Sequence, residues 1–283
     1  MSSVTGIRHS FVGRWVRQVL HAVYSFQHRD GQPVHYHLAN GVDIQLYPEG
    51  EIAEFLVLQR FFEKAEMALA AAYLKPGMNV IDVGANIGVY SILAQKQVGE
   101  AGSIWAFEPS LESYRRLIRN IALNKCGSVK AVQLALSNRL DETFVLQSDP
   151  GFGDAYRYLA PAQSTTAASG ETVPVLTLDL YASQNGITNV DFMKVDVEGC
   201  ESMVFAGARE LLASSSRLVV MFESDAGWCA RAGCRQQDSF DLFRALDFQL
   251  FAWHGGKWKT DESSLLAAAT IWAARNILAL PTI

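Results

Sequence analysis

A glycine-rich segment, "VIDVGANIGVYS" from Val80 to Ser91, constrains the fold of this chain more than any other feature. β-Branched residues lead into Asp82, glycines follow as Gly84 and Gly88, and a helical pattern begins at Val89. This order is typical of a strand, a tight loop and a helix, a unit that holds a nucleotide-like ligand beside the helix N-terminus. We therefore predict an α/β protein with such a ligand site.

The sequence after this unit alternates between strand and helix patterns. That alternation predicts a mostly parallel sheet with helices on both faces. A segment rich in Gly, Ser, Ala and Pro over 148–170 is predicted to be a long loop. The expected strands are 79–83, 103–107, 129–135, 173–176, 191–195, 218–222, 248–253 and 277–280, and the expected helices include 89–97 and 111–123.

The sequence before this unit has a different organisation. Apolar residues recur at helical spacing over 11–23. The residues before Asp30 include four arginines and no acidic residue. This basic amphipathic helix is predicted to pack on its own domain or on a second subunit, with a membrane surface or a transit peptide as alternatives. "PVHYHLANGVDIQLYP" predicts a hairpin around Asn40-Gly41, and a helix is expected over 51–74. We divide the chain into an N-terminal extension, 1–75, and a larger domain, 76–283.

Composition excludes several function classes. The 283 residues carry a net charge of -5, which argues against nucleic acid as a partner because phosphate binding requires clustered Lys and Arg. The four cysteines form no C-x-x-C pair, so neither a zinc site nor a disulfide framework is indicated. We predict a cytoplasmic protein that acts on a small molecule.

The glycine loop and its neighbours indicate which ligand is bound. A dinucleotide fingerprint, G-x-G-x-x-G, requires glycine where this chain has Asn86. Asp82 opens the loop, and a carboxylate there suits a ligand with an ammonium group better than a pyrophosphate. Glu108 ends the next predicted strand, where a carboxylate accepts hydrogen bonds from ribose hydroxyls. Asp82 and Asn86 favour S-adenosylmethionine over a nicotinamide cofactor, whereas Glu108 fits the ribose of either ligand.

A second charged segment follows a later strand, in "VDFMKVDVEGCESMVFAGARELL". If the strand conformation continues, alternation places Lys194, Asp196 and Glu198 on one side at the carboxyl edge of the sheet. Three charges there are costly unless they are solvated or used. We interpret this segment as part of the active site.

These motifs resemble those of the FkbM-type S-adenosylmethionine-dependent methyltransferases. The matching segments are "VIDVGANIGVYSILA", "AFEPS", "LALSN", "VPVLTLDLY", "DFMKVDVEGCESMVFAGA" and "RNILAL". The resemblance implies a class I methyltransferase (Rossmann-like) fold with an antiparallel C-terminal strand, in addition to the N-terminal helix and hairpin. It also implies O-methylation of a sugar, glycan or polyketide precursor or another small metabolite.

The resemblance also implies roles for particular residues. The expected cofactor site consists of Asp82, Gly84, Ala85, Asn86, Gly88, Tyr90, Glu108, Pro109, Ala135, Leu136 and Asp196. Asp196 and Glu198 are the first candidates for the base that takes the acceptor's proton, His254 is the second, and Lys194 is weaker because it is normally charged.

The acceptor side is less sharply defined. Glu223, Trp228 and Tyr156 are predicted to contact the acceptor, with Phe152, Tyr158, Trp253 and Trp258 as further aromatic candidates. We assign no metal site, although the sequence leaves open a magnesium ion held by Asp196, Glu198 and Glu223. N-methylation of a small molecule or nucleic acid, and a catalytically silent cofactor-binding module, are the alternative functions.

Overall fold

The computed structural model describes residues 32–38, 41–47, 63–139, 144–149, 153–161, 170–254, 256–275 and 280. The basic helix predicted near the N-terminus and most of the strand predicted over 277–280 lie outside these residues, as does Phe152. Of the helix predicted over 51–74, the structure describes α4, Lys64–Tyr73.

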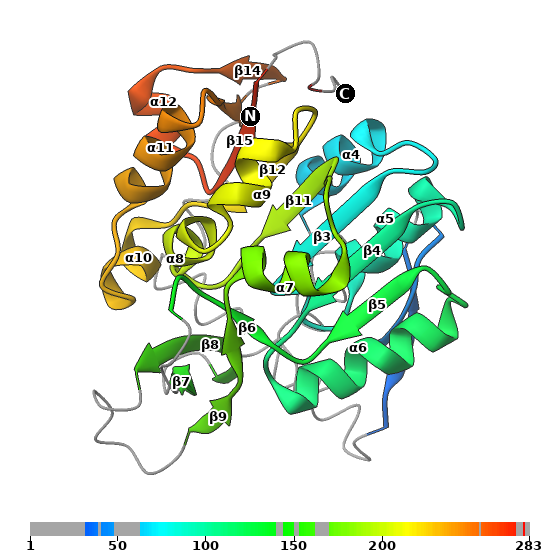
Figure 1. Ribbon diagram of the computed structural model, residues 1–283. Helices are drawn as coiled ribbons and strands as arrows, with labels where there is room; N and C mark the ends of the chain where they lie inside the picture. The colour runs from blue at the N-terminus through cyan, green and yellow to red at the C-terminus, as the bar shows by residue number, and fades with distance from the viewer. Residues whose placement is uncertain are drawn as a thin grey trace, which may run out of the picture.

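A central sheet organises the described part of the chain, with strand order β14-β13-β15-β12-β11-β3-β4-β5 (Figure 1). Neighbouring strands from β5 to β12 are parallel, whereas β15 is inserted antiparallel between β12 and β13. This arrangement confirms the predicted α/β class I methyltransferase fold. The strands are β3 Asn79–Val83, β4 Ser103–Phe107, β5 Val129–Val132, β11 Phe192–Val195, β12 Val219–Glu223, β13 Gln249–His254, β14 Lys257–Lys259 and β15 Thr270–Ala274.

Helices pack on both faces of this sheet and bury two apolar clusters. One cluster joins α4 and α5 to the sheet, and the other joins α7, α8, α9, α11 and α12 to the opposite face. No described helix has the length and apolar character that crossing a membrane requires. The remaining helices are α5 Val89–Val98, α6 Leu111–Leu123, α7 Leu178–Asn185, α8 Glu201–Ala206, α9 Arg209–Ser214, α10 Ala226–Arg231, α11 Gln236–Ala245 and α12 Glu262–Ala267.

Strand β3 carries a buried carboxylate within an otherwise apolar run. Val80 contributes to one apolar cluster and Ile81 and Val83 to the other, so the strand is buried on both faces. Asp82 lies within this apolar run and is 1% exposed. A buried carboxylate requires compensating partners, and the neighbouring strand and α5 supply them.

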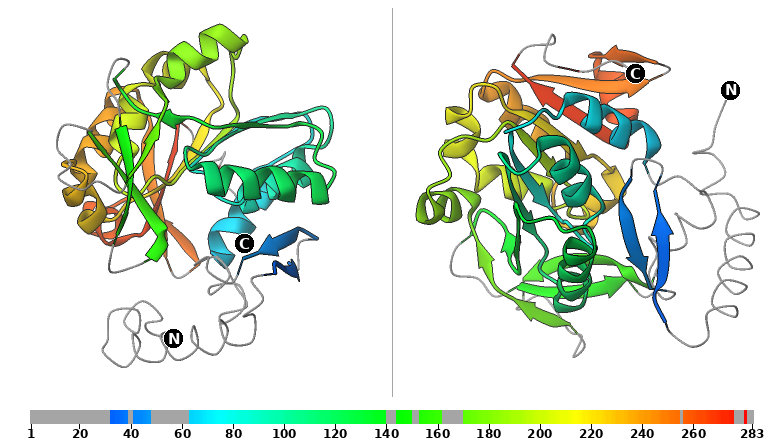
Figure 2. Two further views of the ribbon diagram at one scale, coloured as in Figure 1. Left: turned by 90° about the horizontal axis from the view of Figure 1, so that it is seen from below. Right: turned by 90° about the vertical axis from the view of Figure 1, so that its right-hand side faces the viewer.

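The predicted hairpin is confirmed as β1, Val34–His37, paired antiparallel with β2, Asp43–Leu46. It lies against α6, as both views in Figure 2 show. Asn120 of α6 is fully buried, accepts a hydrogen bond from the backbone of Gln45 at 2.8 Å and donates to the carbonyl of Ile87 at 2.9 Å. The hairpin is thus connected through one side chain to the glycine-rich loop.

Two predicted strands are each divided in the structure. The strand predicted over 129–135 ends as β5 at Val132, and Ala135–Leu136 forms a separate strand, β6. The strand predicted over 173–176 is interrupted at Pro174, which has no N–H to donate to a strand partner. The pieces are β9, Glu171–Val173, and β10, Val175–Leu176, and β10 pairs in parallel with β6.

The prediction of a long loop over 148–170 was wrong in part. The segment contains β8, Gly153–Pro161, which pairs antiparallel with β7, Phe144–Asp149, and β7 also pairs with β9. Strands β7, β8 and β9 form a small sheet, seen below β6 in Figure 1. The Gly, Ser and Pro content of the segment indicated a loop, although the residues of β8 are paired in this sheet. Strand β15, which the sequence patterns did not predict, supplies the antiparallel insertion between β12 and β13.

Candidate active site

The register between β3 and β11 creates the centre of the site. Lys194 is directly opposite Asp82 in this parallel pair, so their side chains project on the same face. The Lys194 ammonium lies 3.8 Å from Asp82 Oδ1, 3.1 Å from Asp196 Oδ2, and donates a hydrogen bond to the carbonyl of Gly84 at 3.1 Å. Asp82 Oδ2 accepts a hydrogen bond from Ser91 Oγ of α5 at 2.6 Å.

These contacts determine the charge states of the group. Burial alone would lower the pKa of Lys194, but the carboxylates of Asp196 and Asp82 outweigh it and raise that pKa. Burial raises the pKa of Asp82, and Lys194 and Ser91 oppose this shift. Lys194 therefore stays an ammonium at neutral pH, which argues for an electrostatic role and against the base role considered for it.

The loop after β3 approaches β11 closely. Gly84, Asn86 and Gly88 all have positive φ angles, of 74°, 48° and 94°. A Cβ atom on Gly84 would collide with the backbone carbonyl oxygen of Asp196. Glycine is therefore required at position 84 for both conformation and space, and this explains the loop's spacing. The left-handed conformation of Asn86, a non-glycine residue, is typical of functional sites.

Glu108 connects this loop to the next helix. Its Oε2 accepts a hydrogen bond from the backbone N–H of Asn86, and its Oε1 accepts one from Ser110, both at 2.9 Å. The residue is 7% exposed, and Pro109 follows it at the end of β4. Two backbone donors hold the carboxylate in one orientation, as a group that recognises a ligand requires.

Glu63 belongs to this site and was not predicted. Its carboxylate accepts a hydrogen bond from the hydroxyl of Tyr90 at 2.8 Å, and the Tyr90 ring lies 5.3 Å from the Lys194 ammonium. Glu63 precedes α4 with a left-handed φ of 40°, and it is far from the matching motifs in sequence. Sequence patterns assigned its segment to a packing helix, so no signal singled it out.

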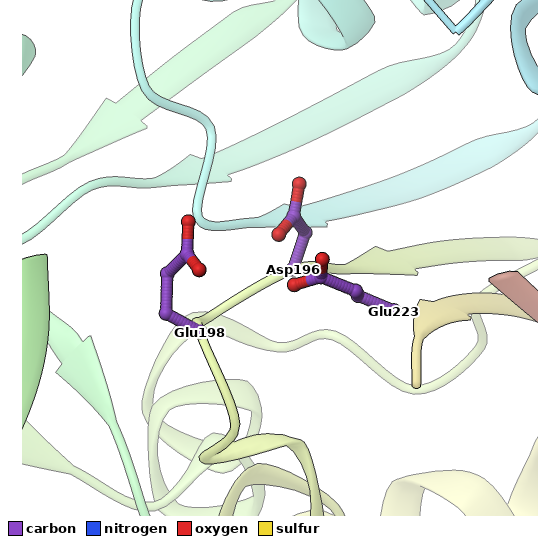
Figure 3. Close-up of side chains that lie close together, drawn as sticks. All are labelled: Asp196, Glu198 and Glu223. Atoms are coloured by element: carbon purple, nitrogen blue, oxygen red, sulfur yellow. The ribbon is translucent and has the colours of Figure 1, made fainter. Parts of the chain in front are cut away.

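Three acidic side chains, those of Asp196, Glu198 and Glu223, converge near the ends of β11 and β12 (Figure 3). Val195 is opposite Phe222 in the parallel pair of β11 and β12, so Asp196 and Glu223 follow at neighbouring strand ends. Glu198 joins them, and one carboxylate oxygen from each of the three residues lies within 4.8 Å of the other two. The predicted alternation holds for Lys194 and Asp196 but not for Glu198, because β11 ends at Val195 and Glu198 adopts a left-handed φ of 54°.

Negative charge accumulates in this acidic group. Burial raises the pKa of Glu223 well above the usual glutamate value, and the charges of Asp196 and Glu198 raise it further. Beneath the group, Glu201 is 2% exposed and its Oε1 accepts hydrogen bonds from the backbone N–H groups of Val197 and Gly199, at 3.0 and 3.2 Å. Burial raises the pKa of Glu201 to about 7, although these two donors oppose the shift. Glu201 therefore fixes the backbone that carries Glu198.

The remaining predicted residues lie in different places. His254 is exposed at the end of β13, and β15 separates it from β12, so the structure does not bring it into the acidic group. Trp228 of α10 is nearer, since its backbone closely approaches Gly199 and its ring lies 4.6 Å from the Arg231 guanidinium. The side chains of Tyr156 and Tyr158 fall outside the described part of the chain.

Trp253 and Trp258 have a packing role that differs from the acceptor contact considered for them. Their ring centroids are 4.8 Å apart, and Trp258 lies 5.6 Å from the buried Trp272. They pack against the apolar cluster on the α4 and α5 face of the sheet. Ala85, Ala135 and Leu136 are all buried, and the cofactor contact predicted for them stays a prediction.

Comparisons with known proteins agree with this geometry. Residues 82–250 match the Methyltransferase FkbM domain, so the chain belongs to this family. Methyltransferase sdnD of Sordaria araneosa is 32% identical over 162 residues, which cover 46% of this chain and 60% of the relative. Methyltransferase 1 of Beauveria bassiana is 25% identical over 144 residues, covering 45% and 57%. The matches thus span about three fifths of the length of these curated relatives.

Solved structures are similar at low identity. Methyltransferase FkbM from Methylobacillus flagellatus is 15% identical with a TM-score of 0.42, covering 93% of this chain and 59% of that one. A SAM-dependent O-methyltransferase from Thermotoga maritima is 13% identical with a TM-score of 0.46, covering 86% and 78%.

The close approach of Gly84 to Asp196 makes a pair of glycine variants informative. We expect Gly84→Ala to destabilise the protein by about 3 kcal/mol, because the added Cβ meets backbone that cannot move aside. Gly77→Ala has a similar positive φ but nothing within 4 Å, so it should lose only the conformational term of about 1–2 kcal/mol. Urea unfolding of both variants measures the difference, and equal losses would contradict the predicted contact.

The pKa of Glu201 predicts a pH-dependent stability. Its pKa is about 7 in the folded chain and near 4.5 when unfolded, so its contribution is complete below pH 4.5 and is lost as pH rises through 7. Glu201→Gln keeps the accepting oxygen without the charge. Between pH 5 and 8 we expect wild type to lose about 2 kcal/mol relative to this variant in urea unfolding. The exposed Glu210→Gln of α9 is the control, and a pH-independent gap for Glu201→Gln would contradict the assignment.

Proposed function

We propose that this chain transfers a methyl group from S-adenosylmethionine to a hydroxyl group of a small metabolite, sugar, glycan or polyketide precursor. The observation that carries this proposal is the acidic group formed by Asp196, Glu198 and Glu223 beside the Gly84 loop. An anionic site next to a nucleoside-binding loop suits a cationic cofactor and an acceptor that must lose a proton. A small-molecule partner and a cytoplasmic location belong to the same proposal.

The residues around the loop fit this cofactor. Glu108 is held by two backbone donors at the end of β4, in the position that recognises ribose hydroxyls in nucleoside-binding α/β sheets. Asp82 Oδ1 is buried and accepts no hydrogen bond from the described residues, and only Lys194 lies near it as a counter-ion. The carboxylates of Asp82 and Asp196 thus leave negative charge for the ligand's ammonium and sulfonium groups. When bound, S-adenosylmethionine supplies a methyl group that its sulfonium charge activates.

The chain's contribution is to orient the acceptor and to take its proton. The Lys194 ammonium lies 3.1 Å from Asp196 Oδ2, whereas the raised pKa of Glu223 favours the protonated form of Glu223. Asp196 and Glu198 are therefore the residues that we propose as base, with Glu223 as an acceptor contact. A positioned carboxylate contributes roughly 10²–10⁴-fold to such a proton transfer.

Oxygen is the favoured acceptor atom because a hydroxyl needs a base more than a neutral amine does. Nucleic-acid N-methyltransferases usually carry an Asn/Asp-Pro-Pro-aromatic element where this chain has Asp196-Val197-Glu198-Gly199. The net charge of -5 also disfavours a nucleic-acid substrate.

Calorimetry with each cofactor tests the ligand assignment. We expect saturable binding of S-adenosylmethionine and of its demethylated product, and none of NAD. Glu108→Gln should raise both dissociation constants about 10- to 100-fold, because the ribose hydroxyls lose a charge-assisted partner worth about 1.5–3 kcal/mol. Glu112→Gln, on the exposed side of α6, should leave them unchanged. Binding of NAD alone, or an unaltered affinity in Glu108→Gln, would contradict the proposal.

Turnover tests the role of the acidic group. Glu198→Gln should still bind cofactor and Asp196→Asn should bind it more weakly, and at saturating cofactor both should lose methyl transfer by roughly 10²-fold or more. If either carboxylate is the base, the loss should shrink as pH rises, because the acceptor then ionises without help. The matched control is Asp241→Asn on the exposed side of α11, which should keep wild-type turnover. Full activity in both acidic variants would remove Asp196 and Glu198 from the reaction.

A further inference from the structure

The geometry of the acidic group matches the size of a metal ion. Asp196, Glu198 and Glu223 each offer one carboxylate oxygen, and these atoms lie within 4.8 Å of one another (Figure 3). Oxygen ligands lie about 2.0–2.6 Å from magnesium or calcium, so two ligands of one ion are separated by at most about 5 Å. A single divalent cation can therefore contact all three residues with small side-chain adjustments.

A separate observation concerns Glu223. Its Oε2 atom is fully buried and has no hydrogen-bond partner among the described residues. Carboxylate oxygens of Asp196 and Glu198 lie within 4.8 Å of a Glu223 carboxylate oxygen. A buried carboxylate oxygen without a partner is costly, so this position favours a bound cation or proton.

Lys194 does not remove this need. Its ammonium lies 3.1 Å from Asp196 and 3.8 Å from Asp82, and it also donates to the carbonyl of Gly84. The positive charge of Lys194 is thus shared between Asp82 and Asp196, and only Asp196 belongs to the acidic group. Among the described residues, Lys194 therefore leaves the buried Oε2 of Glu223 without a partner.

We propose that Asp196, Glu198 and Glu223 bind one divalent cation of the hard class, Mg²⁺ or Mn²⁺. Such ions take six ligands, so three carboxylates leave positions for water and for an oxygen of the acceptor. A coordinated hydroxyl loses its proton more readily, and this proton would pass to a carboxylate or to solvent. This catalytic part rests on the proposed function, whereas binding of the cation does not.

Titration of the 283-residue chain with Mn²⁺, followed by electron paramagnetic resonance without cofactor or acceptor, tests the site. We expect about one Mn²⁺ per chain, displaced by Mg²⁺. Glu223→Gln and Glu198→Gln should each weaken binding about tenfold or more, since even residues behind the ligands have effects of that size. Glu100→Gln, an exposed glutamate after α5, is the matched control and should bind as wild type does.

Two outcomes would overturn this inference. One is the absence of saturable Mn²⁺ binding to the wild-type chain, which would mean that Asp196 and Glu223 share a proton. The other is equal binding by wild type, Glu198→Gln and Glu223→Gln in samples whose thermal unfolding confirms that they are folded. Calorimetry with S-adenosylmethionine in the presence of a chelator tests the proposed cofactor independently of the cation. Failure of the proposed function can thus be distinguished from failure of the cation site.

Discussion

The Lys194 ammonium is the interaction on which the rest of the site depends. It joins the end of β3 to the end of β11 through Asp82, Asp196 and the carbonyl of Gly84. Without this positive charge, two carboxylates would face each other at the carboxyl edge of a sheet that is buried on both faces. The glycine loop and the acidic group are therefore parts of one electrostatic unit.

Other elements extend this unit outward. Glu108 ties the loop to the N-terminus of α6, and Asn120 ties α6 and the hairpin back to the loop through Ile87. Glu63 reaches the unit from the opposite side through the Tyr90 hydroxyl. The segment before residue 82 therefore contributes to the site, although the family match begins only at that position. A nucleoside cofactor would meet a surface that several distant segments hold in place.

Buried negative charge is the chemical property that these contacts produce. Lys194 offsets part of it, while burial raises the pKa of Glu201 and of Glu223. A site of this kind favours a cationic ligand over its neutral product and favours the loss of a proton from an acceptor. The proposed metal ion would be attracted by the same charge, so the proposed recognition of cofactor, acceptor and cation would have a common electrostatic origin.

The sequence alone determined the class of fold, the glycine loop and the positions of Asp82, Glu108 and Asp196, because strand alternation and loop spacing are local properties. It did not determine that Pro174 separates two small strands, that β8 lies within a Gly- and Pro-rich segment, or that β15 is the inserted antiparallel strand. Only the tertiary structure decided that Glu223 and Glu198 meet Asp196, that His254 lies apart and that Glu63 reaches Tyr90. Those outcomes depend on strand order and parallel register, which bring together residues that no local pattern connects.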